Sequence, residues 1–325
     1  MRYVRPLMQV GPARPDEAIV FGACWFTHVE TLSRSDAARI VPVSDLTDAE
    51  SAPFRNAGSA PQIMGILNTT LDSFSDGGKH NTRADAAAHG QVLIGQGADI
   101  LDIGGESTRP GAAIVDIDEE IARTAPVISD LRAKGVTTPI SIDTRKAAVA
   151  VAALDAGASI VNDVSGFTYD PDLAALCAER GVPVCVMHAQ GDPQTMQDNP
   201  VYDDVLLDVY DFLAARISAL QAAGIAQDKI IADPGIGFGK TLEHNLTLLN
   251  RISLFHSLGV PILLGASRKR FIGTIGNAPE ASNRAPGSVG VALAAIAQGV
   301  QIIRAHDVAE HAQAIALWRA SVAHR

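Results

Sequence analysis

Polar and charged side chains recur in this sequence directly after short apolar runs. The stretch ADILDIGGESTRPG at residues 98–111 passes from apolar residues through two glycines into Glu106, Ser107, Thr108, Arg109 and Pro110. A guanidinium fork matches the oxygens of a phosphate or a carboxylate in both geometry and charge. The chemistry predicted here is therefore anion binding, provided that other runs bring further polar groups to the same place.

The other apolar runs end in the same way. The groups that follow the eight runs are Asn68; Asp102 with Glu106–Arg109; Asp143 and Arg145; Asn162 and Asp163; Met187 and His188; Asp233; Ser267, Arg268, Lys269 and Arg270; and Arg304, His306 and Asp307. One aspartate after a strand is usually a helix cap or a turn residue. Eight polar endings together are much harder to explain in that way, so we interpret them as one shared site.

The acids of this set suit a nitrogen heterocycle. Asp143, Asn162 and Asp233 offer hydrogen-bond acceptors and one amide. Buried donors and acceptors must pair, so these groups predict a ligand with several N–H donors.

The bases suit phosphate and come mostly from other runs. Arg109, Arg304 and His306 supply cations that match phosphate oxygens. Together with the acids, they predict a pocket that binds a heterocycle at one end and an anion at the other.

Two loops that follow the apolar runs can be interpreted either as ordinary solvated loops or as parts of the site. DPGIGFGK, from Asp233 to Lys240, lacks the spacing of a phosphate-binding loop, and Lys240 can simply be solvated. Phe238, between two glycines, is a candidate to pack on a ligand ring. The long polar segment from Asn68 to His80 is either a lid, in which Asp72 and Asp76 approach a cation, or an ordinary solvated loop.

The spacing of the runs predicts the elements that position these groups. The runs begin at Gln62, Ala98, Pro139, Ala158, Pro183, Lys229, Pro261 and Val300, and amphipathic helical patterns separate them. Near-continuous hydrophobicity is typical of parallel strands that are buried on both faces. Eight strand–helix units predict an α/β fold of the (β/α)8 TIM-barrel type, in which such groups meet at the carboxyl ends of the strands. A doubly wound open sheet is the rival, and the lack of a Gly-rich dinucleotide turn speaks against it.

Residues 1–60 differ from the rest of the chain. We interpret them as an N-terminal extension, strand-like between Glu17 and Leu32, with a loose linker near Asp48–Pro61. The barrel then occupies residues 61–325. Because every chemical motif begins at Asn68 or later, we expect the extension to be separable from the barrel. The competing possibility is that the segment IVFGACWF packs on the barrel bottom as a plug.

Composition excludes several classes of function. The chain has 36 acidic and 26 basic residues among 325, a formal net charge of −10, which argues against nucleic-acid and anionic-membrane binding. No apolar stretch predicts a transmembrane helix, and the N-terminus is a poor signal peptide. Three cysteines without a CxxC pattern indicate a reducing, cytoplasmic environment, with burial favoured over a metal role for them.

At this point the motifs match a known family. MGILNTTLDSFSDGG, ILDIGGESTRPGA, SIDTRK, IVNDVSG, VMHAQGDPQTMQ, IIADPGIGFGK, LLGASRKRFIG and IIRAHDV occur in that order from about Gln62 to the end of the chain. Together they resemble the dihydropteroate synthase family, the pterin-binding barrels. The resemblance implies a Mg²⁺-assisted transferase of folate biosynthesis, a homodimer and a sulfonamide target. It implies a reaction of 6-hydroxymethyl-7,8-dihydropterin diphosphate with 4-aminobenzoate.

The resemblance also assigns roles to individual residues. The implied pterin-binding positions are Asp143, Asn162, Met187, Asp233 and Lys269, of which Asp143, Asp233 and Lys269 take part in catalysis. The implied diphosphate-binding positions are Asn68, which also holds the metal, with Arg109, Arg304 and His306. The implied aminobenzoate-binding positions are Thr108, Pro110, Phe238, Lys269 and Arg270. Asp72, Phe74 and Asp76 belong to the first mobile loop, and Glu106 is interpreted as a carboxylate that fixes its own loop.

Two positions depart from the family pattern. Leu71 stands where the family usually has a proline, and Arg270 where many members have a serine. Losing the proline frees the backbone dihedral of the first loop. If the backbone at Leu71 suits proline, we expect Leu71→Pro to lower the KM for 4-aminobenzoate a few-fold.

Two other functions are compatible with a pterin-binding barrel. Corrinoid-dependent methyltransferases use similar acids but release no diphosphate, and the STRPG motif with Arg304 and His306 speaks against them. A non-catalytic pterin-binding protein is the third possibility. Diphosphate release without cobalamin separates the three.

Overall fold

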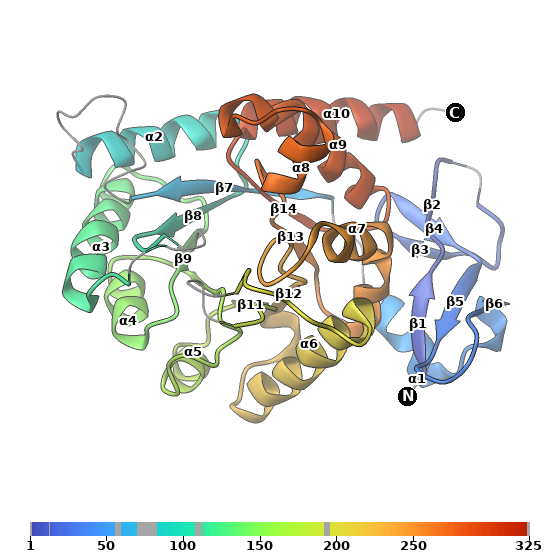
Figure 1. Cartoon of the computed structure of the whole chain (residues 1–325). Coiled ribbons are helices and arrows are strands. Elements are labelled where there is room, and N and C mark those ends of the chain that lie inside the picture. The colour runs from blue at the N-terminus through green and yellow to red at the C-terminus, as the bar shows by residue number, and fades with distance from the viewer. Residues whose placement is uncertain are drawn as a thin grey trace.

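The computed structural model describes residues 2–12, 14–55, 60–69, 83–107, 112, 114–191 and 196–323. Its main body is a parallel barrel ringed by helices, and the N-terminal strands lie beside one end of it (Figure 1). The segments 70–82 and 108–111, which carry part of the predicted site, lie outside the described residues.

Eight parallel strands form the barrel, as the apolar runs predict. They are β7 (Gln62–Asn68), β8 (Ile100–Gly104), β9 (Ile140–Asp143), β10 (Ile160–Asp163), β11 (Val184–Met187), β12 (Ile230–Asp233), β13 (Leu263–Leu264) and β14 (Ile302–Ala305). Their order is β12-β11-β10-β9-β8-β7-β14-β13, and a single bridge between Ala232 and Ile262 joins the two ends. The barrel prediction is confirmed, and the open-sheet rival is excluded.

The helices lie around the outside of the barrel (Figure 1). They are α2 (Arg83–Gly95), α3 (Ile117–Ala133), α4 (Ala147–Asp155), α5 (Leu173–Arg180), α6 (Val205–Ala222), α7 (Leu242–Asn250), α8 (Arg270–Ile275), α9 (Ala285–Ile296) and α10 (Val308–Ala323), with short 3-10 turns η3 (Gln227–Lys229), η4 (Ile252–Leu258) and η5 (Ala281–Arg284). Gly181 stops α5 at a φ of 62°, a left-handed conformation that favours glycine. None of the described helices is both long and apolar enough to cross a membrane.

The N-terminal part folds into two small antiparallel sheets. One contains β1 (Tyr3–Pro6), β5 (His28–Leu32) and β6 (Arg39–Pro42), and the other contains β2 (Gln9–Val10), β3 (Ile19–Phe21) and β4 (Cys24–Phe26). Short turns η1 (Val43–Asp45), α1 (Asp48–Ser51) and η2 (Ala52–Phe54) follow. The structure departs here from the loose linker predicted from Asp48 onward: Thr47 caps α1 with a capping box, and the Phe54 ring is fully buried 5.4 Å from that of Phe26. The sequence did not predict this turn, because Phe54 is the only residue of α1 and η2 that is buried and the others give no apolar pattern.

The N-terminal sheets are packed against the barrel wall. The Ser253 hydroxyl in η4 donates to the Pro6 carbonyl at 2.9 Å, and the Phe21 ring lies 4.5 Å from the ring of His256. The Cys24 thiol donates to the Ile296 carbonyl at 3.4 Å. Because η4 leads into β13 and Ile296 precedes β14, these contacts lie at the amino end of the barrel. They favour the plug alternative over a separable extension.

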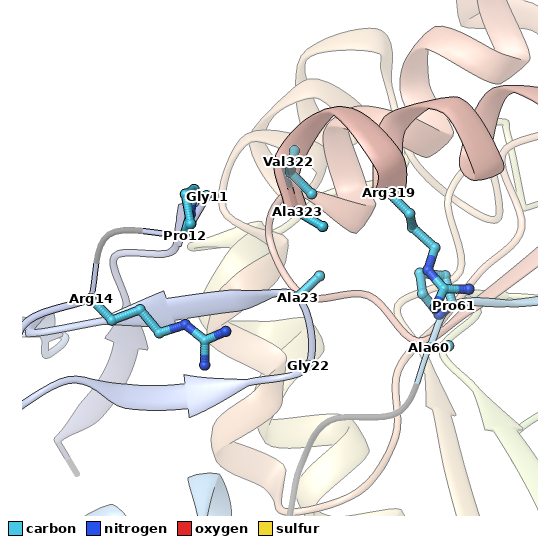
Figure 2. A pocket seen from close by; sticks show the side chains of 10 residues that line it. All are labelled: Gly11, Pro12, Arg14, Gly22, Ala23, Ala60, Pro61, Arg319, Val322 and Ala323. Atoms are coloured by element: carbon cyan, nitrogen blue, oxygen red, sulfur yellow. The ribbon is translucent and has the colours of Figure 1, made fainter. Parts of the chain in front are cut away.

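A hollow of about 470 Å³ remains between the extension and α10 (Figure 2). Small residues line most of it, and Arg14 and Arg319 approach it from opposite sides. Ala60 and Pro61, which directly precede β7, form part of its wall, so it too lies at the amino end. It is therefore at the opposite end of the barrel from the predicted site.

Candidate functional site

The barrel interior changes from apolar to polar along several strands towards their carboxyl ends. A buried apolar layer near the amino ends consists of Met64, Ile100, Ile160, Cys185, Leu263 and Ile302. Side chains two positions apart share a face of a strand, so the next inward layer holds the polar Asp102, Asn162 and Arg304 together with Ile66, Met187 and Gly265. The strands thus bring the predicted polar residues together at the carboxyl end of the barrel, where barrel enzymes have their active sites.

An ion-pair network links four of these strands. The Arg304 guanidinium donates to Asp102 Oδ2 at 2.6 Å and to Asp143 Oδ2 at 2.8 Å. Asn162 Nδ2 donates to the same Asp102 oxygen at 3.2 Å. Asp102 is fully buried, and its Oδ1 has no hydrogen-bond partner among the described residues. Asp102, found in the second run but given no role by the sequence, therefore ties Asn162 and Arg304 together.

Burial favours the neutral, protonated form of two carboxyl groups at this end of the barrel, those of Asp143 and Asp233. Burial raises the pKa of Asp143 to about 8, although the neighbouring Arg304 opposes the shift. Burial also raises the pKa of Asp233, whose Oδ1 accepts a 2.7 Å hydrogen bond from the Gly235 backbone. Such perturbed carboxyls in one place are typical of functional sites.

Lys269 lies against the loop that follows β12. Its ammonium donates to the Ile236 carbonyl and lies 4.3 Å from the centre of the Phe238 ring. Burial lowers the pKa of Lys269 to about 7, while Asp233 opposes the shift and Arg304 adds to it. The structure thus places Lys269, Phe238 and Asp233 next to one another, whereas the neighbouring Arg270 is exposed at the start of α8.

The remaining bases have fixed partners. His306 Nδ1 lies 3.0 Å from the Ser267 hydroxyl, which also accepts the His306 backbone N–H at 3.1 Å. Arg268, whose φ is 58°, donates to both carboxylate oxygens of Asp307. Its Nε lies 3.0 Å from Oδ2, and its Nη2 donates to Oδ1. The Arg268–Asp307 pair therefore joins the ends of β13 and β14, and His306 is held beside it.

Glu106 belongs to a buried charge cluster below the second loop. Lys146 Nζ donates to Glu106 and Glu120 at 2.6 Å each and to the Val115 carbonyl at 2.7 Å. Glu106 also accepts the Val115 backbone N–H at 2.9 Å, and Arg145 at 3.0 Å. Burial alone would raise the pKa of Glu106, but Lys146, the Val115 N–H and Arg145 together hold it below its usual value. The interpretation of Glu106 as a loop-fixing carboxylate is confirmed.

Some predicted residues cannot be placed. Thr108, Arg109 and Pro110, and likewise Leu71, Asp72, Phe74 and Asp76, lie outside the described residues. Asn68 closes β7 at the same level as Gly104 and Asp143, and its side chain is half-buried. Within the described part of the chain, no group of three or more His, Cys, Asp or Glu side chains could hold a metal ion.

Lys240 is a residue that sequence reasoning missed. The sequence left open that it is solvated, but it is buried, and its amine donates to two carbonyls of its own loop and lies 2.8 Å from His188 Nδ1. The only signal in the sequence was its position directly after three alternating glycines, which indicates a tightly folded loop.

Comparison with known proteins agrees with this geometry. A profile of the family described as "Pterin binding enzyme" matches residues 64–306, three quarters of the chain. The chain belongs to the pterin binding enzyme family. It is similar to the dihydropteroate synthase of Escherichia coli (strain K12), with 46% identity over 264 residues, 81% of this chain and 93% of that protein. The dihydropteroate synthase of Synechocystis is also 46% identical, over 81% of this chain and 92% of that protein.

Solved structures of pterin binding enzymes have the same barrel. A Xanthomonas albilineans dihydropteroate synthase with 4-aminobenzoic acid superimposes with a TM-score of 0.78, at 44% identity, over 82% of this chain and 95% of that one. The same enzyme in complex with 7,8-dihydropteroate gives a TM-score of 0.75 at 42% identity, over 82% of this chain and 95% of that one. The family profile begins at residue 64, so the two N-terminal sheets lie outside the matched region.

Proposed function

We propose that this chain is a transferase that condenses 6-hydroxymethyl-7,8-dihydropterin diphosphate with 4-aminobenzoate, giving 7,8-dihydropteroate and diphosphate in folate biosynthesis. The observation that carries the proposal is the buried layer of Asp143, Asn162 and Asp233 beside Lys269, in a barrel 46% identical to dihydropteroate synthases. This layer offers mainly acceptors, and the edge of a dihydropterin ring offers mainly N–H donors.

We propose that the ring binds on this layer. Asp233, Asp143 and the Asn162 carbonyl oxygen accept the ring N–H groups, and Met187 packs beside the ring. The Asn162 amide donates through Nδ2 to Asp102, so its Oδ1 is the atom that remains for a ligand. Lys269, whose ammonium lies over the Phe238 ring, donates to the carbonyl group of the pterin ring.

The diphosphate then lies towards the mouth of the barrel. Asn68, Arg109, Arg304 and His306 are the proposed contacts. Arg304 uses Nε and Nη2 for Asp102 and Asp143, so Nη1 is the nitrogen that makes no hydrogen bond to a described residue. These cations disperse the charge that collects on the leaving group as the C–O bond breaks.

Mg²⁺ fits the residues at this mouth. Mg²⁺ is usually bound by one or two protein oxygens together with substrate phosphates rather than by a complete protein cage. The Asn68 side chain is half-buried at the end of β7 and makes no hydrogen bond to a described residue, so its amide oxygen is available for that role. The metal would neutralise diphosphate and so make it a better leaving group.

Positioning and charge stabilisation account for the remaining chemistry. Loss of diphosphate leaves a methylene cation that is conjugated with the pterin ring, and the Asp143 and Asp233 carboxylates lie where they can stabilise that charge. The neutral amine of 4-aminobenzoate attacks this carbon, and the proton that the new C–N bond leaves on nitrogen passes to water or to the departing diphosphate. Thr108, Pro110, Phe238, Lys269 and Arg270 hold the aminobenzoate, and its alignment needs no strong base.

Genetic complementation tests the proposed function. A bacterial strain that lacks its own dihydropteroate synthase, and therefore depends on supplied folate end products, should grow without them when it expresses this chain. A sulfonamide should abolish that growth, and 4-aminobenzoate should restore it. Failure to grow with the protein present in soluble form would contradict the proposal.

We also propose a cytoplasmic homodimer. Three free and buried cysteines are compatible with a reducing compartment, and the dimer is carried over from the resemblance. Light scattering of the purified chain should give about twice the mass of 34.0 kDa, and a mass of one chain would contradict the dimer.

A further inference from the structure

Lys240 lies inside the loop that joins β12 to α7. Its side chain is only 3% exposed, and its Nζ lies 2.9 Å from the Gly235 carbonyl, 3.0 Å from the Phe238 carbonyl and 2.8 Å from His188 Nδ1. These three contacts occupy the amine group of Lys240 completely. Two of them close the loop on itself, and the third fixes it to the end of β11.

No carboxylate is paired with this buried lysine. Among the described residues Lys240 makes no ion pair, and burial lowers its pKa well below the usual value. Burying an amine without an opposite charge is unfavourable unless its hydrogen bonds are complete. The hydrogen bonds that Lys240 makes within the loop and to His188 therefore compensate its burial, and they depend on this conformation of the loop.

The loop backbone lies tightly against the residues that follow β11. Gly235 and Gly239 have φ values of 68° and 60°. A Cβ atom at Gly235 would lie 1.8 Å from the His188 carbonyl oxygen, and one at Gly239 would lie 2.5 Å from the Gln190 carbonyl oxygen. The loop is thus pressed against the residues that follow β11, and the Tyr202 hydroxyl adds a 2.7 Å hydrogen bond to the Gly239 carbonyl.

The same loop supports two candidate site residues. Phe238, whose carbonyl Lys240 holds, presents its ring to the Lys269 ammonium at 4.3 Å. The Ile236 carbonyl accepts a hydrogen bond from Lys269. A change in the path of the loop would therefore displace the Phe238 ring that faces Lys269, while Asp143 and Asn162, whose side chains bond to Arg304 and Asp102 rather than to the loop, would stay in place.

We propose that Lys240 is a positioning residue for the second substrate: it touches no substrate, and it sets the affinity for the aromatic amine by holding Phe238 in place. This inference rests on the proposed function, because it assumes that Phe238 packs on 4-aminobenzoate. It predicts that the amine site and the pterin site respond differently to a change at residue 240.

The test compares the full-length wild type with Lys240→Met and a matched control. Methionine keeps most of the side-chain volume and removes the three donors. Lys229→Met is the control, since Lys229 also holds one carbonyl, that of Gly181 at 2.5 Å, but does so just before β12 at the amino end. The measurements are KM for 4-aminobenzoate and kcat from product formation, and binding of the pterin diphosphate alone by calorimetry.

Lys240→Met should raise the KM for 4-aminobenzoate at least tenfold and change the pterin dissociation constant less than threefold. Lys229→Met should change both less than twofold. An unchanged amine KM in folded Lys240→Met, or an equal loss at both sites, would overturn the inference. Absence of product with the wild type would instead contradict the proposed function, and the two failures are therefore distinguishable.

A milder variant covers the case in which Lys240→Met does not fold. Tyr202→Phe removes one hydroxyl that holds the same loop from outside. It should raise the amine KM about two- to threefold and leave pterin binding unchanged. If the KM for the amine equals that of the wild type, the loop does not set amine affinity and the inference is wrong.

Discussion

At the scale of single residues, Asp102 explains how the acceptor layer is arranged. Its Oδ2 accepts hydrogen bonds from both the Asn162 amide and the Arg304 guanidinium. One buried carboxylate therefore orients both of these side chains at the same time. The sequence could predict that Asp102 follows an apolar run. It could not predict this role, because the partners are 60 and 202 residues away along the chain.

Asp233→Asn should impair the enzyme much more than a surface substitution would. The amide keeps the shape of the carboxyl but presents a donor where the ring presents donors. We expect a loss of at least about 2 kcal/mol in binding or transition-state stabilisation, measured as kcat/KM for the pterin substrate. A kcat/KM near that of the wild type would remove Asp233 from the site.

Arg304→Ala should weaken binding of the diphosphate substrate more than binding of the corresponding pterin alcohol. The structure adds a second effect, because the variant leaves the buried Asp102 and Asp143 without their cation. Both ligands should then lose some affinity, and only the excess loss for the diphosphate reports a phosphate contact. Calorimetry with the two ligands measures that ratio, and equal losses would show that Arg304 does not contact phosphate.

At the scale of elements, the strand ends could be predicted well and the loops poorly. Each strand carries its own signal, since it is short, apolar and buried on both faces. No sequence signal marked Lys146 or Lys240 as buried, because a lysine in a polar loop is usually solvated. Both are buried by contacts with distant segments: Lys146 reaches Glu106 and Glu120, and Lys240 reaches His188.

Lys146→Met should destabilise the fold by about 3–5 kcal/mol at neutral pH, because it leaves two buried carboxylates short of a cation. The folded-state pKa of Glu106 is lowered, so its contribution is present above the unfolded carboxyl pKa and is lost as the pH falls through the folded value. The difference in unfolding free energy between wild type and variant should therefore shrink as the pH falls below about 4.5, the ordinary pKa of a glutamate.

Chemical denaturation at several pH values measures this difference. Leu→Ala changes elsewhere in the core would serve as controls whose cost does not depend on pH. If the cost of Lys146→Met stays constant well below pH 4.5, the cluster does not act through the charge of its carboxylates.

At the scale of the whole molecule, the N-terminal extension is part of the packed structure. We still propose a domain boundary near residue 60, because the barrel begins at Gln62 and the family match at residue 64. Contacts at Ser253, His256 and Ile296 nevertheless bury the extension against the barrel. Sequence could not decide this, since packing between two folded parts leaves no periodic signal in either.

A protein that begins at residue 60 should therefore be less stable than the full chain. Its barrel would expose His256 and Ser253, which are now 1% exposed each. We expect a fall in Tm of several degrees and a greater tendency to aggregate, while any folded fraction keeps kcat, because the extension lies at the opposite end from the site. A truncated protein as stable as the full chain would restore the separable-extension interpretation.

The most direct test of the central claim is diphosphate release by the purified full-length chain. The assay contains Mg²⁺ and no cobalamin, and it supplies the pterin diphosphate and 4-aminobenzoate together or singly. We expect release of one diphosphate per dihydropteroate formed when both substrates are present, and little when the amine is omitted. No release with both substrates, or equal release without the amine, would contradict it.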